Sequence, residues 1–371
     1  MTPPQSAPPP STIDERNPMS LLLSELSLRD VTFRNRAWVA PMCQYSSVDG
    51  HPTDWHLVHL GALARGGAGL VITEATAITP RGRISPSDAG IWSDAQAQDY
   101  ERITSFIRGQ GAVAGIQLSH AGRKASTRTP WLGRGSVPLS EGGWLTGGPS
   151  AVAYPGLDAP SALDVAELDQ LVGDWAAAAR RAVQAGFQVI ELHAAHGYLL
   201  HQFLSPLSNR REDEYGGDLD GRARLLLRVV DAVRSTIPEG MPLFVRVSAT
   251  DWVPGGLQVD EVAELARQLA SRGVDLIDVS SGGNSPDQQI PVGPGYQVPL
   301  ASRVRQVSGL PVAAVGLITE PKQAEEILAE GSADAVLIAR AALREPSWPQ
   351  RAAFELGDDL AWPPQYERAR P

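Results

Sequence analysis

Cysteine is almost absent from this chain of 371 residues, in which Cys43 is the single example. One thiol cannot form an intramolecular disulfide, a Cys-x-x-Cys redox pair or a cysteine-held iron–sulfur cluster, so these are excluded. Long apolar runs are missing as well. The leucines at 21–23 are too few for a membrane span, and no signal-peptide cleavage site follows them. We therefore expect a cytoplasmic protein with no membrane partner.

The charge balance is acidic. The chain has 32 Lys and Arg residues against 42 Asp and Glu residues, a formal net charge of −10 at pH 7. Most of the surface would repel a phosphate backbone, so we expect no nucleic-acid partner, although a local basic pocket for one phosphate fits this balance. Residues 1–18 are rich in proline and serine and predict a disordered leader, which leaves 19–371 as a single domain.

Short apolar runs alternate with longer amphipathic stretches from about Arg36 onward. The runs are rich in Val, Ile and Ala and lack the polar alternation of half-exposed strands, which indicates a parallel sheet buried on both faces. Eight such runs predict an α/β fold of the TIM (β/α)8 barrel type rather than an open sheet. They are 37–40, 69–73, 112–116, 187–191, 243–247, 275–279, 311–315 and 335–339.

Helical patterns separate the runs, most clearly at 163–185, 219–236, 259–271 and 320–330. Gly186, Gly273 and Gly331 follow three of them, as expected for helix C-terminal caps. The segment 119–160 after the third run is too long for a simple crossover and is rich in Gly, Pro and Trp. We expect it to form an excursion over the functional face of the barrel, or else a flexible insertion without function.

The carboxyl ends of barrel strands converge on one face, where such enzymes carry out their chemistry. Here these positions hold mostly hydrogen-bonding groups, with glycine where a ligand must come close. Gly316 and Arg340 follow the seventh and eighth runs, at the loops that commonly bind phosphate. The chain lacks a Walker A motif and a GxGxxG fingerprint, so a flat heteroaromatic mononucleotide fits better than a dinucleotide. The alternative is that Gly316 only turns the chain and Arg340 is a solvated charge.

Two imidazoles and a phenol follow the fourth run, in His193-Ala194-Ala195-His196-Gly197-Tyr198. Residues three apart face the same way on a first helical turn, so we expect His193 beside His196, with Tyr198 reaching in from the side. Such a cluster can hold a polarised oxygen and deliver a proton. The alternatives are a surface turn with incidental polar residues and a zinc site of His193, His196 and His201. No HExxH motif or cysteine pair supports the zinc site, and we expect no metal.

Further motifs stand beside this cluster. They are Ala40-Pro41-Met42-Cys43-Gln44-Tyr45, Gln117 with His120-Ala121-Gly122-Arg123-Lys124, Phe203-Leu204-Ser205-Pro206, Ser208-Asn209-Arg210, Glu214-Tyr215-Gly216-Gly217, Arg246 and Gln365-Tyr366-Glu367-Arg368. With these motifs the chain resembles the Old Yellow Enzyme family of flavin-dependent ene-reductases, from about Leu21 to Arg368. It is most similar to the thermophilic-like branch. Its 131–154 stretch is closer to xenobiotic reductases than to the shortest members.

The resemblance implies noncovalently bound FMN, with NADPH or NADH as the electron donor. It implies FMN contacts at Ala40, Pro41, Met42, Cys43, Ala75, Gln117, Arg246, Gly316, Ala339 and Arg340. Arg246 is expected beside the flavin N1/O2 edge, where a cation stabilises the negative charge of reduced flavin. Cys43 resembles a cysteine that hydrogen-bonds the flavin and tunes its potential, or is a buried thiol that packs as a small hydrophobe. Many relatives have glycine at the position of Ala339, where a backbone N–H contact should tolerate alanine.

The resemblance also implies an activity, the reduction of the C=C bond of activated alkenes such as enones, enals, maleimides and nitroalkenes. His193 and His196 resemble the pair that binds the substrate oxygen, and Tyr198 resembles the donor that protonates the α-carbon after hydride transfer from flavin N5. Tyr45 resembles a second phenol of the substrate pocket, or is a packing aromatic. Arg368, in the tail 360–371, resembles an arginine that enters a neighbour's active site, which implies a homodimer or homotetramer. Otherwise the tail is frayed and solvated.

Three other functions share parts of these features. Reductases of dienoyl thioesters that carry an iron–sulfur cluster need more cysteines and a further carboxyl-terminal domain. The acidic charge disfavours a flavin barrel that modifies tRNA. A noncatalytic flavin sensor would have no need of a proton donor such as Tyr198.

Overall fold

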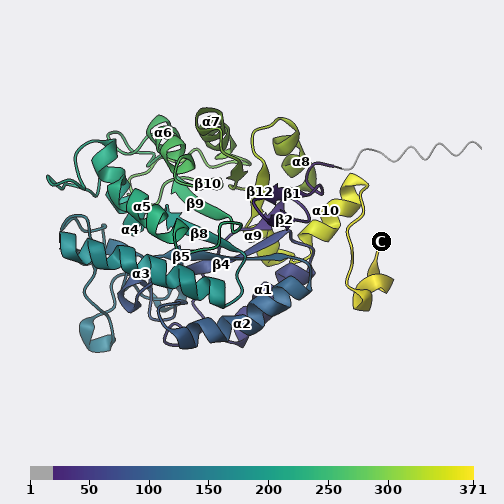
Figure 1. The fold of residues 1–371 in the computed structure, drawn as a ribbon, viewed down its shortest axis with the longest axis horizontal. Coiled ribbons are helices and arrows are strands. Elements are labelled where there is room, and N and C mark those ends of the chain that lie inside the picture. Colours follow the sequence, from purple (N-terminus) through teal and green to yellow (C-terminus); the bar gives the residue numbers. More distant parts are fainter. Residues whose placement is uncertain (1–19) are drawn as a thin grey trace, which may run out of the picture.

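The fold is a closed barrel of parallel strands surrounded by helices (Figure 1). The computed structural model describes residues 20–371, so the leader expected at 1–18 lies outside the described residues. Neighbouring strands follow the order β10-β11-β12-β3-β4-β5-β8-β9, and the predicted TIM barrel is thus confirmed. The barrel strands are β3 (Ala37–Val39), β4 (Leu70–Ala77), β5 (Val113–Ser119), β8 (Val189–Ala194), β9 (Leu243–Ser248), β10 (Leu276–Ser280), β11 (Val312–Ala314) and β12 (Ala335–Ile338).

The helices form the outer layer. The longer helices bury an apolar stripe on their inner side, as α3 does with Leu168, Leu171 and Trp175. The expected glycines at 186, 273 and 331 stand just after helix ends with φ of 85°, 82° and 68°, in the left-handed region that favours glycine. The helices are α1 (Asp54–Arg65), α2 (Asp94–Gly109), α3 (Val165–Gln184), α4 (Leu199–Leu204), α5 (Leu219–Arg234), α6 (Val259–Ala270), α7 (Val298–Ser308), α8 (Pro321–Ala329), α9 (Arg340–Arg344) and α10 (Trp348–Leu356).

An apolar plug fills the amino-terminal end of the barrel. The hairpin of β1 (Leu26–Leu28) and β2 (Val31–Phe33) contributes Phe33, whose ring centroid lies 4.6 Å from that of Trp38. Trp38 stacks in turn on Phe244 at 5.8 Å, inside a buried cluster with interior residues of the other strands. Stacked, fully buried aromatic rings exclude water and ligands from this end. The carboxyl ends of the strands are left to form a site.

The segment between β5 and α3 forms the expected excursion. It contains the short elements η2 (Gly122–Lys124), η3 (Pro130–Leu132), η4 (Leu139–Glu141), β6 (Gly147–Gly148) and β7 (Ser161–Ala162). Trp144 packs against the cluster that includes Cys43 and Tyr198, and Trp131 meets the ring of Tyr45 edge to face. The excursion therefore covers the carboxyl face. In the described part of the chain, none of the helices has the length and apolar character needed to cross a membrane.

Candidate active site

His193 and His196 come together at the carboxyl end of β8. Their ring centroids lie 5.2 Å apart, edge to face, and the ring of Tyr198 lies 4.9 Å from that of His193. The expected helical turn is wrong, because His193 belongs to the strand and α4 begins only after Tyr198. Between β8 and α4 the chain turns at His196, whose φ of 58° lies in the left-handed region.

Two hydrogen bonds fix this left-handed turn, which is uncommon for a side chain with a Cβ. The backbone N–H of His196 donates to Ser248 Oγ at 2.9 Å, and Lys124 Nζ donates to the carbonyl oxygen of His196 at 2.8 Å. The two imidazoles are therefore positioned by contacts from β9 and from the excursion. Sequence spacing alone does not contain these contacts.

Both imidazoles are neutral. Burial, and then the positive charge of Arg246, hold the pKa of His193 and of His196 well below the usual range. His193 Nδ1 accepts from the backbone N–H of Ala195 at 3.3 Å, so Nε2 carries the proton and is free to donate.

Ser280 forms a hydrogen bond with the ring of His196. Its Oγ lies 2.7 Å from His196 Nε2 but 3.4 Å from Gln297 Oε1, which already accepts from Ser281 Oγ at 2.6 Å. We infer that Ser280 donates to Nε2, which leaves the Nδ1–H of His196 available to a ligand. Each imidazole then presents one N–H donor.

Tyr198 keeps its proton at neutral pH. Burial raises the pKa of the phenol well above its usual range. Lys124 Nζ lies 5.1 Å from the centre of the Tyr198 ring, and burial followed by the nearby Arg123 lowers the pKa of this lysine to about 8. A protonated phenol next to a cation can release a proton and retain the resulting charge.

Both ring nitrogens of His201 lie close to other protein groups. Its Nδ1 accepts from Gly197 N–H at 2.8 Å, and its Nε2 lies 3.1 Å from Asp251 Oδ1. Across residues 20–371 no three His, Cys, Asp or Glu side chains gather in a way that could hold a metal ion. His201 instead supports the turn that carries Tyr198.

The residues expected to contact FMN all lie toward the carboxyl end of the barrel. Three belong to strands, and the others follow β3, β11 and β12. They are Ala75, Gln117 and Arg246 within strands, and Ala40, Pro41, Met42, Cys43, Gly316, Ala339 and Arg340 after strands. Cys43 packs in one apolar cluster with Ala75 and Tyr198. Burial raises the pKa of its thiol well above the usual range, so Cys43 is a thiol rather than a reactive thiolate.

A cavity of about 220 Å³ opens between the loops that follow β10, β11 and β12. Gly316 keeps it open, because a Cβ at this position would lie 2.8 Å from Gln297 Nε2 and its φ is 125°. Arg340 and Arg344 line the cavity, and neither has an ion-pair partner among residues 20–371. The position and the two guanidinium groups fit a phosphate. A larger, mainly apolar cavity of about 330 Å³ lies beside α3, away from these phosphate loops.

Arg246 completes the features that fit a flavin. The side chain is 6% exposed, and its Nε lies 3.0 Å from Asp278 Oδ2. Next to it, Gln117 Nε2 donates to Glu191 Oε1 at 2.7 Å, which leaves Gln117 Oε1 as an acceptor. A buried guanidinium at the mouth of the barrel would stabilise an anionic ring edge.

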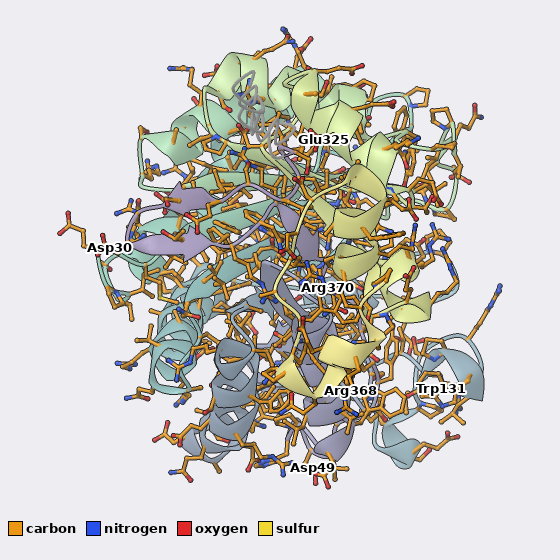
Figure 2. All side chains as sticks on the ribbon, turned by 90° about the vertical axis from the view of Figure 1, so that its right-hand side faces the viewer. Asp30, Asp49, Trp131, Glu325, Arg368 and Arg370 are labelled. Atoms are coloured by element: carbon orange, nitrogen blue, oxygen red, sulfur yellow. The ribbon has the colours of Figure 1, made fainter. Side chains whose placement is uncertain are left out.

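The two other expected substrate residues, Tyr45 and Arg368, lie in different parts of the molecule. Tyr45 has φ of 51°, and its ring centroid lies 5.7 Å from that of Trp131, so the excursion borders it. Arg368 lies on η5 (Pro364–Ala369), exposed on the outside of the molecule (Figure 2). Tyr366 holds this segment against α1, where its hydroxyl accepts from Arg65 Nη1 at 2.7 Å. Arg368 is thus not brought to the imidazoles of its own chain.

Sequence reasoning assigned no role to several residues that shape the site: Lys124, Glu191, Ser280, Gln297 and Asp278. Glu191 and Asp278 carry a visible signal, since each is an acid inside an otherwise apolar run and two positions before a polar strand end. Lys124 and Gln297 carry none, because their contacts depend on how distant loops pack.

Fold and site together define a class, the barrel oxidoreductases with a mononucleotide cofactor. The chain matches the model of the NADH:flavin oxidoreductase / NADH oxidase family over residues 22–359. It is 44% identical over 351 residues to an NADPH dehydrogenase of Geobacillus thermodenitrificans, covering 94% of this chain and 98% of the relative. An Old Yellow Enzyme homologue from Zymomonas mobilis superposes with a TM-score of 0.75 at 28% identity, over 94% of this chain and 99% of that chain.

A 2-naphthoyl-CoA reductase shares the fold with a TM-score of 0.82 at 23% identity, and the match spans 91% of this chain and about half, 52%, of that chain. The protein belongs to the NADH:flavin oxidoreductase / NADH oxidase family, within which it is of the Old Yellow Enzyme type. It is an oxidoreductase with FMN as its cofactor and NAD(P)H as its electron donor. The expected family, enzyme class and cofactors are confirmed.

The neutral imidazoles give a first prediction. Because the folded-state pKa of each lies well below that of a free histidine, His193 and His196 should stay uncharged at pH values where histidines of the unfolded chain, which titrate at about 6.5, take up a proton. Below about pH 6.5 these two histidines take up protons in the unfolded chain but not in the folded protein. They therefore lower the free energy of unfolding increasingly as the pH falls. Side-chain ¹⁵N NMR, assigned with His193→Asn and His196→Asn, measures the charge states. An imidazole of the pair that titrates between about pH 6 and 7 contradicts this prediction.

Proposed function

We propose that the protein is an ene-reductase, which reduces the C=C bond of small activated alkenes such as enones, enals, maleimides and nitroalkenes. The observation that carries this proposal is the cluster of two neutral imidazoles and a protonated phenol at the open end of the barrel. FMN, when bound, supplies the hydride chemistry, with NADPH or NADH as donor. A noncatalytic flavin protein would have no use for this set of donors.

The imidazoles hold and polarise the substrate oxygen. His193 Nε2–H and His196 Nδ1–H are the donors left free by the contacts to Ala195 and Ser280. Two donors aimed at the oxygen of a carbonyl or nitro group stabilise the negative charge that develops there, which makes the β-carbon electrophilic. Their neutrality matters, because each nitrogen then has a fixed role as donor or acceptor.

Tyr198 delivers the proton to the α-carbon. The phenol is protonated at working pH, and the ammonium group of Lys124 near its ring offsets the charge left behind. Trp144 packs against the same cluster and limits the access of water. Tyr45 borders the substrate, with Trp131 at its edge. The FMN contacts proposed are those named above, from Ala40 to Arg340.

A two-step colour experiment tests the function. Purified holoprotein should be yellow, should bleach with NADPH under anaerobic conditions, and should regain its colour with 2-cyclohexenone or a maleimide. Detection of the saturated product confirms C=C reduction. Bleached protein that none of a panel of enones, enals, maleimides and nitroalkenes reoxidises contradicts the ene-reductase proposal.

Tyr198→Phe separates proton delivery from flavin reduction. Loss of a positioned proton donor should slow the alkene half-reaction on the order of 10²–10⁴-fold, while flavin reduction by NADPH stays within about twofold. Stopped-flow absorbance at the flavin band measures both half-reactions. The matched control is Tyr154→Phe, a half-buried phenol near the same Lys124, with its ring centre 5.0 Å from Nζ. Equal loss in both half-reactions of Tyr198→Phe removes the assigned role.

We also propose a single domain whose tail, 360–371, completes the active site of a second copy in a homodimer or homotetramer. Support comes from Arg368, which is exposed on a segment held at the outside of its own chain by the Arg65–Tyr366 contact. An arginine at the rim of a neighbour's pocket would bind substrate or orient Tyr45 from outside. The localisation proposed is cytoplasmic.

Subunit mixing tests this exchange. Arg368→Ala should raise the KM for alkenes about tenfold or more, since a charged hydrogen bond contributes roughly 1.5–3 kcal/mol. Arg370→Ala is the control, because Arg370 pairs with Asp359 of its own chain at 2.5 Å. If the tail enters the site of a neighbouring subunit, an oligomer that mixes Arg368→Ala chains with Tyr198→Phe chains contains some sites with native Tyr198 from one chain and native Arg368 from the other. The activity of the mixture should then exceed the summed activities of the two variants. No recovery, in oligomers shown to have exchanged subunits, contradicts the proposal.

A further inference from the structure

A layer of polar side chains crosses the barrel interior below the imidazoles. Gln117, Glu191, Arg246 and Asp278 come from the adjacent strands β5, β8, β9 and β10. Glu191 is in register with Gln117, and Asp278 with Arg246, whereas across β8 and β9 Arg246 is in register with His193. Side chains alternate along a strand, so on β8, β9 and β10 the residues two positions earlier belong to the apolar plug and those two positions later lie nearer the mouth of the barrel. On β8 these are Val189 and His193.

The charges of this layer do not balance if every group is ionised. Glu191 and Asp278 are 0% exposed and Arg246 is 6% exposed, so two carboxylates would face a single guanidinium without water. Glu191 Oε2 and Asp278 Oδ1 have no hydrogen-bond partner among residues 20–371. An uncompensated buried charge costs several kcal/mol, and a carboxyl group avoids this cost by keeping a proton.

The contacts indicate where that proton is. Asp278 lies against the guanidinium of Arg246 at 3.0 Å, which favours its ionised form. Glu191 Oε1 accepts from Gln117, so Oε2 carries the proton toward Asp278. The pKa values agree with this placement. Burial, and then the nearby Asp278, raise the pKa of Glu191 to about 8. Burial raises the pKa of Asp278 only to about 6, because Arg246 counters the effect of burial. The other ionisable groups near Arg246 are His193 and His196, which are neutral, and Cys43 and Tyr296, whose pKa values burial raises. Lys124 is turned toward His196 and Tyr198.

We propose that Glu191 holds a buried proton which it donates to Asp278, and that this proton keeps the charge of Arg246 available to the cofactor. Glu191 is a positioning residue, since it acts through Asp278 and Arg246. With the proton present the layer is neutral, and without it the layer carries one negative charge beneath the flavin site. This inference rests on Arg246 facing FMN, as proposed above. The proton itself requires only the fold.

Infrared spectroscopy of the folded protein detects the proton directly. The wild-type protein at about pH 6 should show a protonated-carboxyl C=O stretch that shifts in D2O, is absent in Glu191→Gln, and disappears as the pH rises above about 8. Asp88→Asn is the matched control, because Asp88 is another buried carboxyl whose pKa burial raises, to about 7, and it lies outside the layer. That variant should lose a different component of the band and keep the one assigned to Glu191.

Asp278→Asn provides a second variant if Glu191→Gln does not fold. It leaves Glu191 as the one carboxyl group of the layer opposite Arg246, so Glu191 should ionise and its band should be lost at about pH 6. A wild-type band unaffected by either variant, or the absence of a protonated-carboxyl band other than that of Asp88, overturns the proposal. Neither measurement depends on alkene reduction, so failure here is distinct from failure of the proposed function.

The second readout is the affinity for the cofactor in its two redox states. The wild-type protein should bind reduced FMN more tightly than oxidised FMN, and this affinity ratio should fall about tenfold between about pH 7 and pH 10 as Glu191 loses its proton. In Glu191→Gln the layer stays neutral, so the ratio should not show this fall. Midpoint potentials measured at each pH, together with FMN dissociation constants, give this ratio. A wild-type protein and Glu191→Gln variant with parallel pH profiles would overturn the link to Arg246.

Discussion

Closure of the barrel is the constraint on which the rest of the structure depends. In a closed sheet of parallel strands every second side chain points inward, and the interior has no route to water except at its ends. The plug of Phe33, Trp38 and Phe244 closes one end. Polar groups further along the strands must therefore satisfy one another or face a ligand at the other end. Arg246 and Gln117 each contact one protein carboxyl group, and in the function proposed above their remaining polar atoms face the cofactor.

This constraint explains why the fold was predictable. A strand buried on both faces needs an apolar run, and each of the eight runs became a barrel strand. Because parallel strands must then end at the same face, the strand-end residues could be expected to converge before their geometry was known. Arg246, Gly316 and the residues after Ala40 do lie at that face. The long insertion was recognisable by length and composition, and the contacts of Trp131 and Trp144 show what it covers.

The local geometry of the imidazole pair could not be predicted in the same way. Helical spacing predicted the correct pair of rings but the wrong backbone conformation. His196 itself is in the left-handed region, and no helical turn joins it to His193. The reason is that distant groups, Ser248 and Lys124, stabilise that conformation. Spacing rules describe neighbours along one element, whereas this turn is determined by three elements that are far apart in the sequence.

The loop after β10 connects the two halves of the site. Ser280 forms a hydrogen bond with His196. Ser281 forms one with Gln297, which lines the cavity suited to a phosphate. Lys124 also donates to the carbonyl oxygen of Gly283 at 3.0 Å in the same loop. Displacement of this loop would therefore change the cavity, the imidazole donor and the cation beside Tyr198 together.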